Sequence, residues 1–240
     1  MTGLTAARFV QLAAGALGSL VAMVSPALPQ EFDPERCTQD AMLVLDASGS
    51  MIHQDGMGAS LLEGARSATR EIVPVATQYR RMGLMTLGPG NGDQCSNVEL
   101  RVPVQDAAAK SIISAVDRLP ADGGTPLSRA VEAAANAMDY RSKPAVLVVV
   151  SDGDETCGRD PCELAERLKA SALDLTIHVI GFGPGNGKTA GARCLADSNG
   201  GRQVTARNAQ ELTTALRQTL VCPQVSNAAL TGNTGRSTSR

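Results

Sequence analysis

Three segments of the chain are nearly uninterrupted runs of apolar residues. They read AMLVLD from Ala41, AVLVVVS from Ala145 and LTIHVIGF from Leu175. The first two runs stop at acidic turns rich in serine or glycine, DASGS and SDGDE. Continuous apolar runs of this length are typical of strands that are buried on both faces of a parallel sheet. These segments are therefore predicted to be the central strands of the fold.

Weaker patterns predict strands at the margins of the same sheet. The segment VELRVPV, residues 98–104, alternates apolar and polar positions as a half-exposed strand does. Its Pro103 cannot donate to a neighbouring strand, so an edge position is favoured. Short strands are also expected at MGLMTLG, residues 82–88, and at QVTA, residues 203–206.

Between the strands, apolar residues recur at helical intervals. Helices are predicted within residues 59–78, 107–119, 126–140, 161–172 and 208–221. Pro126 suits a helix start, and Asn208 followed by Glu211 is a capping pattern, whereas Pro74 should kink or end its helix. Strands alternating with helices predict an α/β fold with a mostly parallel sheet covered on both sides.

Composition narrows the class of partner. The chain has 240 residues, 43% of them hydrophobic, which is enough for one well-packed domain. Its formal net charge is −2 and its charges are scattered, so no basic stripe is available for nucleic acid. Nucleic acid is therefore not an expected partner.

The first residues resemble an export signal. Arg8 precedes an apolar run over residues 9–24, and small residues follow, up to Ala27. We expect residues 1–27 to be a signal peptide cleaved near Ala27, and the mature protein to be periplasmic or secreted. An uncleaved run would instead act as a loose membrane tether, because its length approaches that of a membrane span.

Six cysteines agree with export, because an even number of cysteines in an exported chain indicates disulfides. Six cysteines allow fifteen pairings, and the residues alone do not choose among them. At the other end of the chain, residues 223–240 are rich in Ser, Thr, Gly and Asn, and we expect a disordered tail there.

Oxygen-bearing side chains follow the predicted strands. Asp46, Ser48 and Ser50 follow the first strand, Asp152 follows the strand from Ala145, and Thr125 precedes a helix. Ligands of parallel α/β sheets bind at the carboxyl ends of the strands. Hydroxyl and carboxylate oxygens suit a hard cation such as Mg²⁺. The alternative is that these residues only form turns, for which Asp, Ser, Thr and Gly are all common.

The segments LVLDASGSM, DGGTPLSRAV and LVVVSDGDET, in this order, closely resemble the von Willebrand factor type A domain and its metal-ion-dependent adhesion site. The resemblance covers residues 40–222, which leaves residues 28–39 as a connector. It implies a three-layer, doubly wound, mostly parallel sheet with one antiparallel edge strand, and a bound Mg²⁺ or Mn²⁺.

Carried onto this chain, the resemblance implies that Ser48 and Ser50 bind the metal directly. Thr125 would bind it directly or through water, and Asp46 and Asp152 would act mostly through waters. The implied partner is a protein that offers an Asp or Glu to the metal.

The cysteines look like those of an exported bacterial branch of this family. With that resemblance we expect three pairs, namely Cys157–Cys162, Cys37–Cys222 and, as a hypothesis, Cys95–Cys194. The first pair is close in sequence, the second flanks the domain, and the third joins two loops that both carry GPGNG.

Other chemistries have weaker support. GPGNGKT, residues 183–189, looks like a phosphate-binding loop, but Phe182 stands where its first glycine is required. A nucleotide is therefore not expected, and no G-x-S-x-G hydrolase motif is present. His178 lies inside an apolar run and His53 in a predicted loop, so neither is expected to be catalytic. We expect a binding module and no enzyme; the alternatives are a Mg²⁺-dependent phosphoester or nucleotide enzyme and a regulatory subunit of an ATPase-linked assembly.

Overall fold

Six strands form a single sheet in the order β3-β2-β1-β4-β5-β6 in a computed structural model that describes residues 38–90, 93–184 and 189–222. Only β3 runs antiparallel to its neighbour, and it lies at one edge. The strands are β1 (Ala41–Asp46), β2 (Met82–Leu87), β3 (Val98–Gln105), β4 (Ala145–Ser151), β5 (Leu175–Phe182) and β6 (Gln203–Ala206). This arrangement confirms the predicted fold class, including the edge position of residues 98–104.

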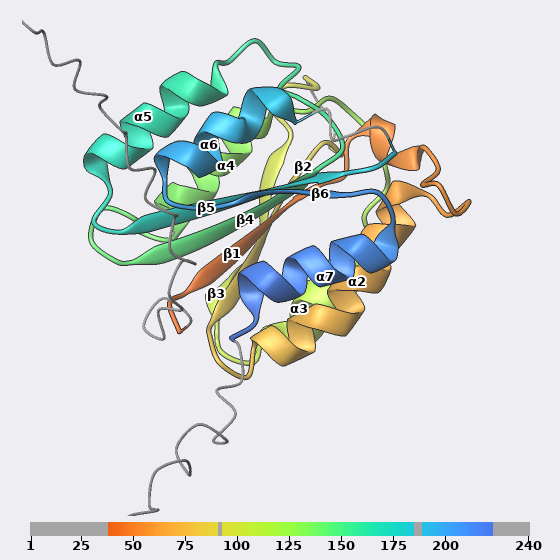
Figure 1. Cartoon of the computed structure of the whole chain (residues 1–240), viewed down its shortest axis with the longest axis horizontal. Helices are drawn as coiled ribbons and strands as arrows, with labels where there is room; N and C mark the ends of the chain where they lie inside the picture. Colours follow the sequence, from red (N-terminus) through yellow and green to blue (C-terminus); the bar gives the residue numbers. More distant parts are fainter. Residues whose placement is uncertain (1–37, 91–92, 185–188, 223–240) are drawn as a thin grey trace, which may run out of the picture. The chain divides into compact units, whose positions relative to one another are not determined.

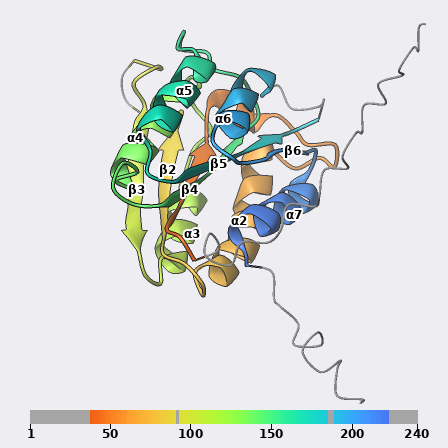
Figure 2. The same ribbon diagram turned by 60° about the vertical axis from the view of Figure 1, so that its left-hand side comes forward.

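Helices cover both faces of the sheet (Figures 1 and 2). One layer holds α2, α3 and α7, and the other holds α4, α5 and α6. The helices are α2 (Leu61–Ala76), α3 (Ala109–Asp117), α4 (Leu127–Ala137), α5 (Pro161–Ser171), α6 (Arg193–Ser198) and α7 (Ala209–Leu220). Two short 3₁₀ turns, η1 (Gly49–Ile52) and η2 (Ala190–Ala192), follow β1 and β5.

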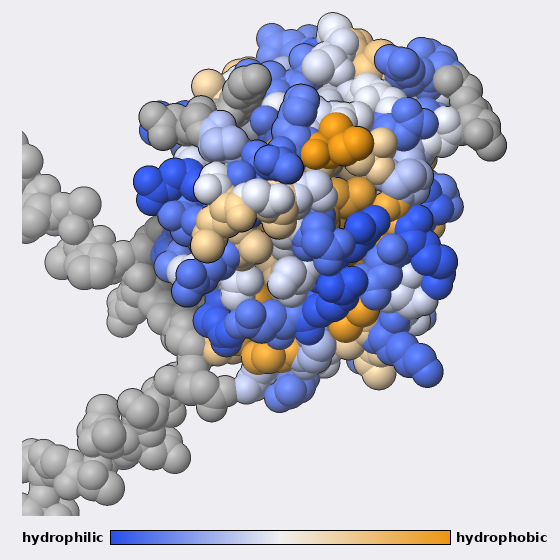
Figure 3. Space-filling view, turned by 90° about the vertical axis from the view of Figure 1, so that its right-hand side faces the viewer, coloured by the Kyte–Doolittle hydropathy of each residue, from blue (hydrophilic) through white to orange (hydrophobic). Residues whose placement is uncertain are grey.

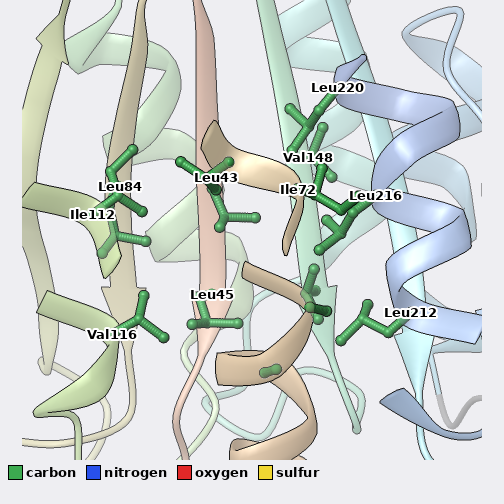
Figure 4. Packing of buried hydrophobic residues seen from close by; sticks show 14 of the residues in the cluster. Leu43, Leu45, Ile72, Leu84, Ile112, Val116, Val148, Leu212, Leu216 and Leu220 are labelled. Carbon is green, nitrogen blue, oxygen red and sulfur yellow. The ribbon is translucent and has the colours of Figure 1, made fainter. Parts of the chain in front are cut away.

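Alternate residues of the buried strands supply the two cores. Leu43 and Leu45 of β1 pack with Ile72 of α2 on one face, where Figure 4 also shows side chains of α3 and α7. Met42 and Val44 belong to the core on the other face. Because both faces of β1 are covered, its residues are all apolar until Asp46, which explains the uninterrupted pattern in the sequence.

Most helix boundaries follow the predicted signals. Asn208 accepts a hydrogen bond from the backbone N–H of Glu211 at 2.9 Å, which confirms it as the cap of α7. Pro74 lies in the last turn of α2, which ends at Ala76. Helix α6 was not predicted, because a segment of six residues is too short to show a helical period.

Two of the predicted disulfides are wrong. Cys157 does not bond Cys162, and Cys95 does not bond Cys194; the bonds are Cys95–Cys157 and Cys162–Cys194. The strand order gives the reason, because β1 and β4 separate the segment after β2 from the segment after β5. The β4–α5 segment lies between them, and its two cysteines bond outward in opposite directions.

Cys222 is disulfide-bonded, but its predicted partner Cys37 lies outside the described residues. The predicted signal peptide, residues 1–27, most of the predicted connector, residues 28–39, and the predicted tail, residues 223–240, also lie outside them. None of the described helices is both long and apolar enough to cross a membrane.

His178 of β5 makes a pH-dependent contribution to stability. Its Nδ1 accepts a hydrogen bond from the Arg202 backbone N–H at 3.1 Å. Burial, with smaller effects from the charges of Arg202 and Arg80, lowers the pKa of His178 from 6.5 to about 4. The unfolded chain therefore binds the proton first as pH falls. We expect about 3 kcal/mol of the unfolding free energy to be lost between pH 6.5 and pH 4 through this residue.

Urea unfolding at a series of pH values measures this contribution. His178→Asn is the matched variant, because the amide oxygen can accept the same hydrogen bond but does not titrate. The wild-type protein should lose more stability than the variant over this pH range. Parallel curves for the two proteins would contradict the assignment.

Candidate metal centre

The carboxyl ends of β1 and β4 lie side by side at the centre of the sheet. These parallel strands pair Leu45 with Val150, so the next residues along them, Asp46 and Ser151, are neighbours. The strand order also reverses here, since the chain proceeds from β1 to β2 and β3 on one side and to β4, β5 and β6 on the other. Crevices at such reversal points are where open α/β sheets bind ligands.

Asp46 is a fully buried carboxylate that makes no ion pair with any described residue. One oxygen, Oδ1, accepts a hydrogen bond from the Ser48 backbone N–H at 2.8 Å, and Oδ2 accepts one from the Ser151 hydroxyl. Burial nevertheless outweighs these bonds and raises the pKa of Asp46 to about 6, with a smaller contribution from the charge of Asp152. A cation beside Asp46 would relieve this cost.

A chain of short contacts joins the remaining polar groups of this strand end. The Ser48 and Ser50 hydroxyl oxygens are 3.1 Å apart. The Ser50 hydroxyl donates to Asp152 Oδ1 at 2.7 Å, although 102 residues separate the two in sequence. The structure thus brings together four of the five predicted metal residues by direct hydrogen bonds, namely Asp46, Ser48, Ser50 and Asp152.

Thr125 approaches the cluster through the backbone of its loop. The carbonyl oxygen of Gly123, two residues before Thr125, accepts a hydrogen bond from the Gly49 N–H at 3.0 Å. The N–H of Asp122, in the same loop, donates to the Ala47 carbonyl at 3.0 Å. Thr125 itself is 5% exposed, and its backbone N–H donates a hydrogen bond to the Thr156 hydroxyl oxygen in the β4–α5 loop. Within the described chain, no side-chain hydrogen bond joins Thr125 to the other four residues.

Two glycines allow three loops to meet at this point. Gly123 has a φ of +78°, and a Cβ added there would lie 2.0 Å from the Gly88 carbonyl oxygen. Gly88 has a φ of +107°, and its added Cβ would lie 2.4 Å from the Ser48 backbone nitrogen. Both positions therefore require glycine. Gly88, the first residue of the first GPGNG segment, therefore lies directly against Ser48.

The residues present fit a hard divalent cation. The candidate set offers three hydroxyls, from Ser48, Ser50 and Thr125, and two carboxylates, from Asp46 and Asp152. Oxygen-only donor sets are those of Mg²⁺ and Mn²⁺. The two carboxylates balance the charge of such a cation, and the buried charge of Asp46 has no other counterion among the described residues.

The acidic residues that follow Asp152 make hydrogen bonds or ion pairs with nearby parts of the chain. Asp154 accepts a hydrogen bond from the Gly191 N–H at 3.0 Å, and Asp160 caps α5. Glu163 pairs with Arg167. Glu155 accepts hydrogen bonds from the N–H groups of Ser128 and Cys157, each at 2.7 Å.

Two residues with roles at the centre were missed from the sequence. The Ser151 hydroxyl donates a hydrogen bond to Asp46. Its position at the end of an apolar run, next to Asp152, could have identified Ser151 as a residue of the site. The Thr156 hydroxyl oxygen accepts a hydrogen bond from the Thr125 N–H, although 31 residues separate the two in sequence. No pattern in the sequence indicates that contact.

The surface around the candidate metal centre carries both hydrophilic and hydrophobic residues. Figure 3 views the side that lies at the right of Figure 1, where the segment after β1 emerges, and shows mainly hydrophilic residues with some exposed apolar ones. Ile52 and Met57, at 67% and 77% exposure, belong to that segment. His53 is exposed, as expected for a loop residue.

The family model for the von Willebrand factor type A domain matches residues 41–155. Among curated proteins, the uncharacterized protein YwmD of Bacillus subtilis (strain 168) is 27% identical over 211 residues, which are 83% of this chain and 92% of that protein. The matched region of the family model contains all five candidate metal residues.

Solved structures share the fold. The VWA domain of SpRpn10 gives a TM-score of 0.63 at 17% identity and covers 79% of this chain and 100% of that one. Proximal thread matrix protein 1 from the mussel byssus, in a structure with a zinc-occupied MIDAS motif, gives a TM-score of 0.57 at 16% identity, over 77% of this chain and 46% of that one.

Proposed function

Because the family model for the von Willebrand factor type A domain matches residues 41–155 and the fold is that of such domains, we propose that this chain is an exported, metal-dependent protein-binding module. One observation carries the proposal. At the reversal point of the sheet, the Ser48 and Ser50 hydroxyls lie 3.1 Å apart, between a buried Asp46 and Asp152. These groups together supply the oxygen atoms that the proposed cation needs as ligands.

Ser48, Ser50 and Thr125 would hold Mg²⁺ or Mn²⁺ by their hydroxyls, with Asp46 and Asp152 orienting them. The bound cation would supply a positive charge to which a carboxylate of another protein can bind. Since the two carboxylates of the site only balance the cation, the site can still attract the negative charge of an Asp or Glu of the partner. The mussel protein with zinc at its MIDAS motif supports the idea that this type of site holds a divalent metal.

Binding, rather than catalysis, suits the composition of the site. A hydrolytic centre would need a general base within reach of the attacking group. Neither histidine lies at this strand end, since His53 is exposed in the following loop and His178 lies within β5 and is bonded to Arg202. The Ser48 and Ser50 hydroxyls are hydrogen-bonded to each other, and Ser50 donates to Asp152, a carboxylate that is a much weaker base than histidine.

Export is supported by the disulfides. Cys95–Cys157 joins two loops and Cys162–Cys194 joins α5 to α6, and bonds of this kind persist in oxidising compartments. Together with the predicted signal at residues 1–27, they favour a periplasmic or secreted protein whose partner belongs to the cell envelope or its surroundings.

Affinity capture tests the proposal. Wild-type and Asp46→Asn proteins are immobilised and exposed to an envelope extract, once with Mg²⁺ and once with EDTA. We expect a protein that is retained only by the wild type and only with Mg²⁺. Replacing the Asp or Glu residues of that protein by Asn or Gln, one at a time, should identify one residue whose loss abolishes retention. Equal retention in EDTA would contradict the proposal.

A further inference from the structure

We infer that Thr156 is a positioning residue for Thr125, and that the Cys95–Cys157 disulfide fixes Thr156, so that this pair tunes the affinity of the metal centre. The inference rests on the proposed function, because it concerns the same site. It assigns a role to two features outside the five candidate metal residues.

The two threonines are joined by a pair of hydrogen bonds in opposite directions. The Thr125 backbone N–H donates to Thr156 Oγ1 at 2.9 Å, and the Thr156 backbone N–H donates to the Thr125 carbonyl at 3.2 Å. The first bond depends on the side chain of Thr156, and the second depends only on its backbone. Together they hold the peptide groups on both sides of Thr125, whose carbonyl also accepts a hydrogen bond from the Leu127 N–H at 2.9 Å.

Thr125 depends on this support more than the other candidate metal residues do. Asp46, Ser48, Ser50 and Asp152 hold one another by hydrogen bonds at the strand ends. Thr125 makes no such side-chain bond within the described chain, and it lies in a loop before α4. A ligand whose backbone is not fixed must be ordered when the metal binds, and this ordering lowers affinity.

Thr156 is in turn held on both sides. Before it, Glu155 Oε2 accepts a hydrogen bond from the Ser128 N–H, in the first turn of α4, at 2.7 Å. After it, Cys157 is bonded covalently to Cys95 of the β2–β3 loop, and its N–H donates to Glu155 Oε1 at 2.7 Å. The Thr125 loop lies between these segments, because a Cβ on Gly124 would lie 3.3 Å from the Gln94 carbonyl and 3.6 Å from Thr156 Oγ1.

The other disulfide provides a matched comparison. Cys162–Cys194 joins the first turn of α5 to α6, so it leaves the same β4–α5 segment on the opposite side. No described hydrogen bond links either of its cysteines to Thr125 or Thr156. If the Cys95–Cys157 bond acts through Thr156, the two disulfides should differ in their effect on metal binding.

The side-chain bond is tested with Thr156→Val and Thr156→Ser. Valine keeps the branched shape and the backbone N–H but removes Oγ1, whereas serine keeps the hydroxyl. We expect Thr156→Val to weaken Mn²⁺ binding about 10-fold, as loss of an outer support of a metal ligand does, and Thr156→Ser to stay within about 2-fold of the wild type. In EDTA, the Thr125 amide should exchange its hydrogen faster in the valine variant only.

Each result has a distinct meaning. Unchanged Mn²⁺ affinity and unchanged Thr125 exchange in Thr156→Val would overturn the inference while leaving the proposed function intact. A wild-type protein that binds no Mn²⁺ would instead contradict the proposed function, and the exchange experiment in EDTA would still decide whether Thr156 positions Thr125.

The disulfide is tested with two double variants, Cys95→Ser/Cys157→Ser and Cys162→Ser/Cys194→Ser. The first should lower Mn²⁺ affinity about 10-fold, and the second should stay within about 2-fold of the wild type. Circular dichroism confirms folding of both proteins. Equal losses, or a loss only in the second variant, would overturn the role of Cys95–Cys157.

Discussion

An Asp46→Asn protein is expected to fold normally and to bind Mn²⁺ about 100-fold more weakly than the wild type. The substitution removes one of the two negative charges of the centre with almost no change in shape. The Ser48 N–H can still donate to the amide oxygen. The Ser151 hydroxyl can donate to the Gly153 carbonyl, which is 3.0 Å away, while it accepts from the new amide N–H.

Stability measurements in EDTA separate loss of the metal from loss of the fold. In the metal-free protein, burial raises the pKa of Asp46 to about 6, so the folded state binds a proton there more tightly than the unfolded state does. The contribution of Asp46 to stability therefore falls as pH rises from about 4 to about 6. At about pH 8 the asparagine variant should be at least as stable as the wild type in EDTA. A markedly less stable variant would show that its loss of metal binding reflects misfolding.

A Gly123→Ala protein is expected to lose about 2–4 kcal/mol of unfolding free energy. The added Cβ would lie 2.0 Å from the Gly88 carbonyl oxygen, and the φ of +78° is unfavourable for alanine. Neither loop can move freely, because Gly123 accepts a hydrogen bond from Gly49, and Gly88 donates one to the Asn97 carbonyl at 3.1 Å. Relief of the clash must displace backbone next to Ser48 or Thr125.

Gly56→Ala is the control for this substitution. Gly56 lies in the loop after η1, its φ is not in the left-handed region, and no atom lies within 4 Å of an added Cβ. Urea unfolding should show near-wild-type stability for Gly56→Ala and a clear loss for Gly123→Ala. Mn²⁺ titration should also show weaker binding for Gly123→Ala alone. Equal stability of the two variants would contradict the role assigned to the packed loops.

Much of the fold and the core of the candidate site could be predicted from the sequence. The apolar runs ending at Asp46 and Ser151 reveal buried parallel strands, because both faces of such strands are covered. Parallel strands end at one edge of the sheet, so the polar residues that follow them meet. For that reason Ser50 and Asp152 could be placed together although 102 residues separate them in sequence.

The remaining contacts depend on the strand order, which local patterns do not encode. The disulfide pairs follow from the place of the β4–α5 segment between the segments after β2 and β5. Proximity in sequence favoured Cys157–Cys162, but the fold directs the two cysteines to opposite neighbours. The Thr125–Thr156 pair has the same origin, because it links loops that meet only once the sheet is assembled.

The most direct test of the metal centre is anomalous diffraction from crystals of the wild-type protein grown with Mn²⁺. One strong peak is expected within coordination distance of the Ser48 and Ser50 hydroxyls, beside Asp46 and Asp152. Crystals of Asp46→Asn should lack that peak. A peak only elsewhere, such as at the acidic residues Asp154 and Asp160, or no peak in the wild type at saturating Mn²⁺, would contradict the proposed metal centre.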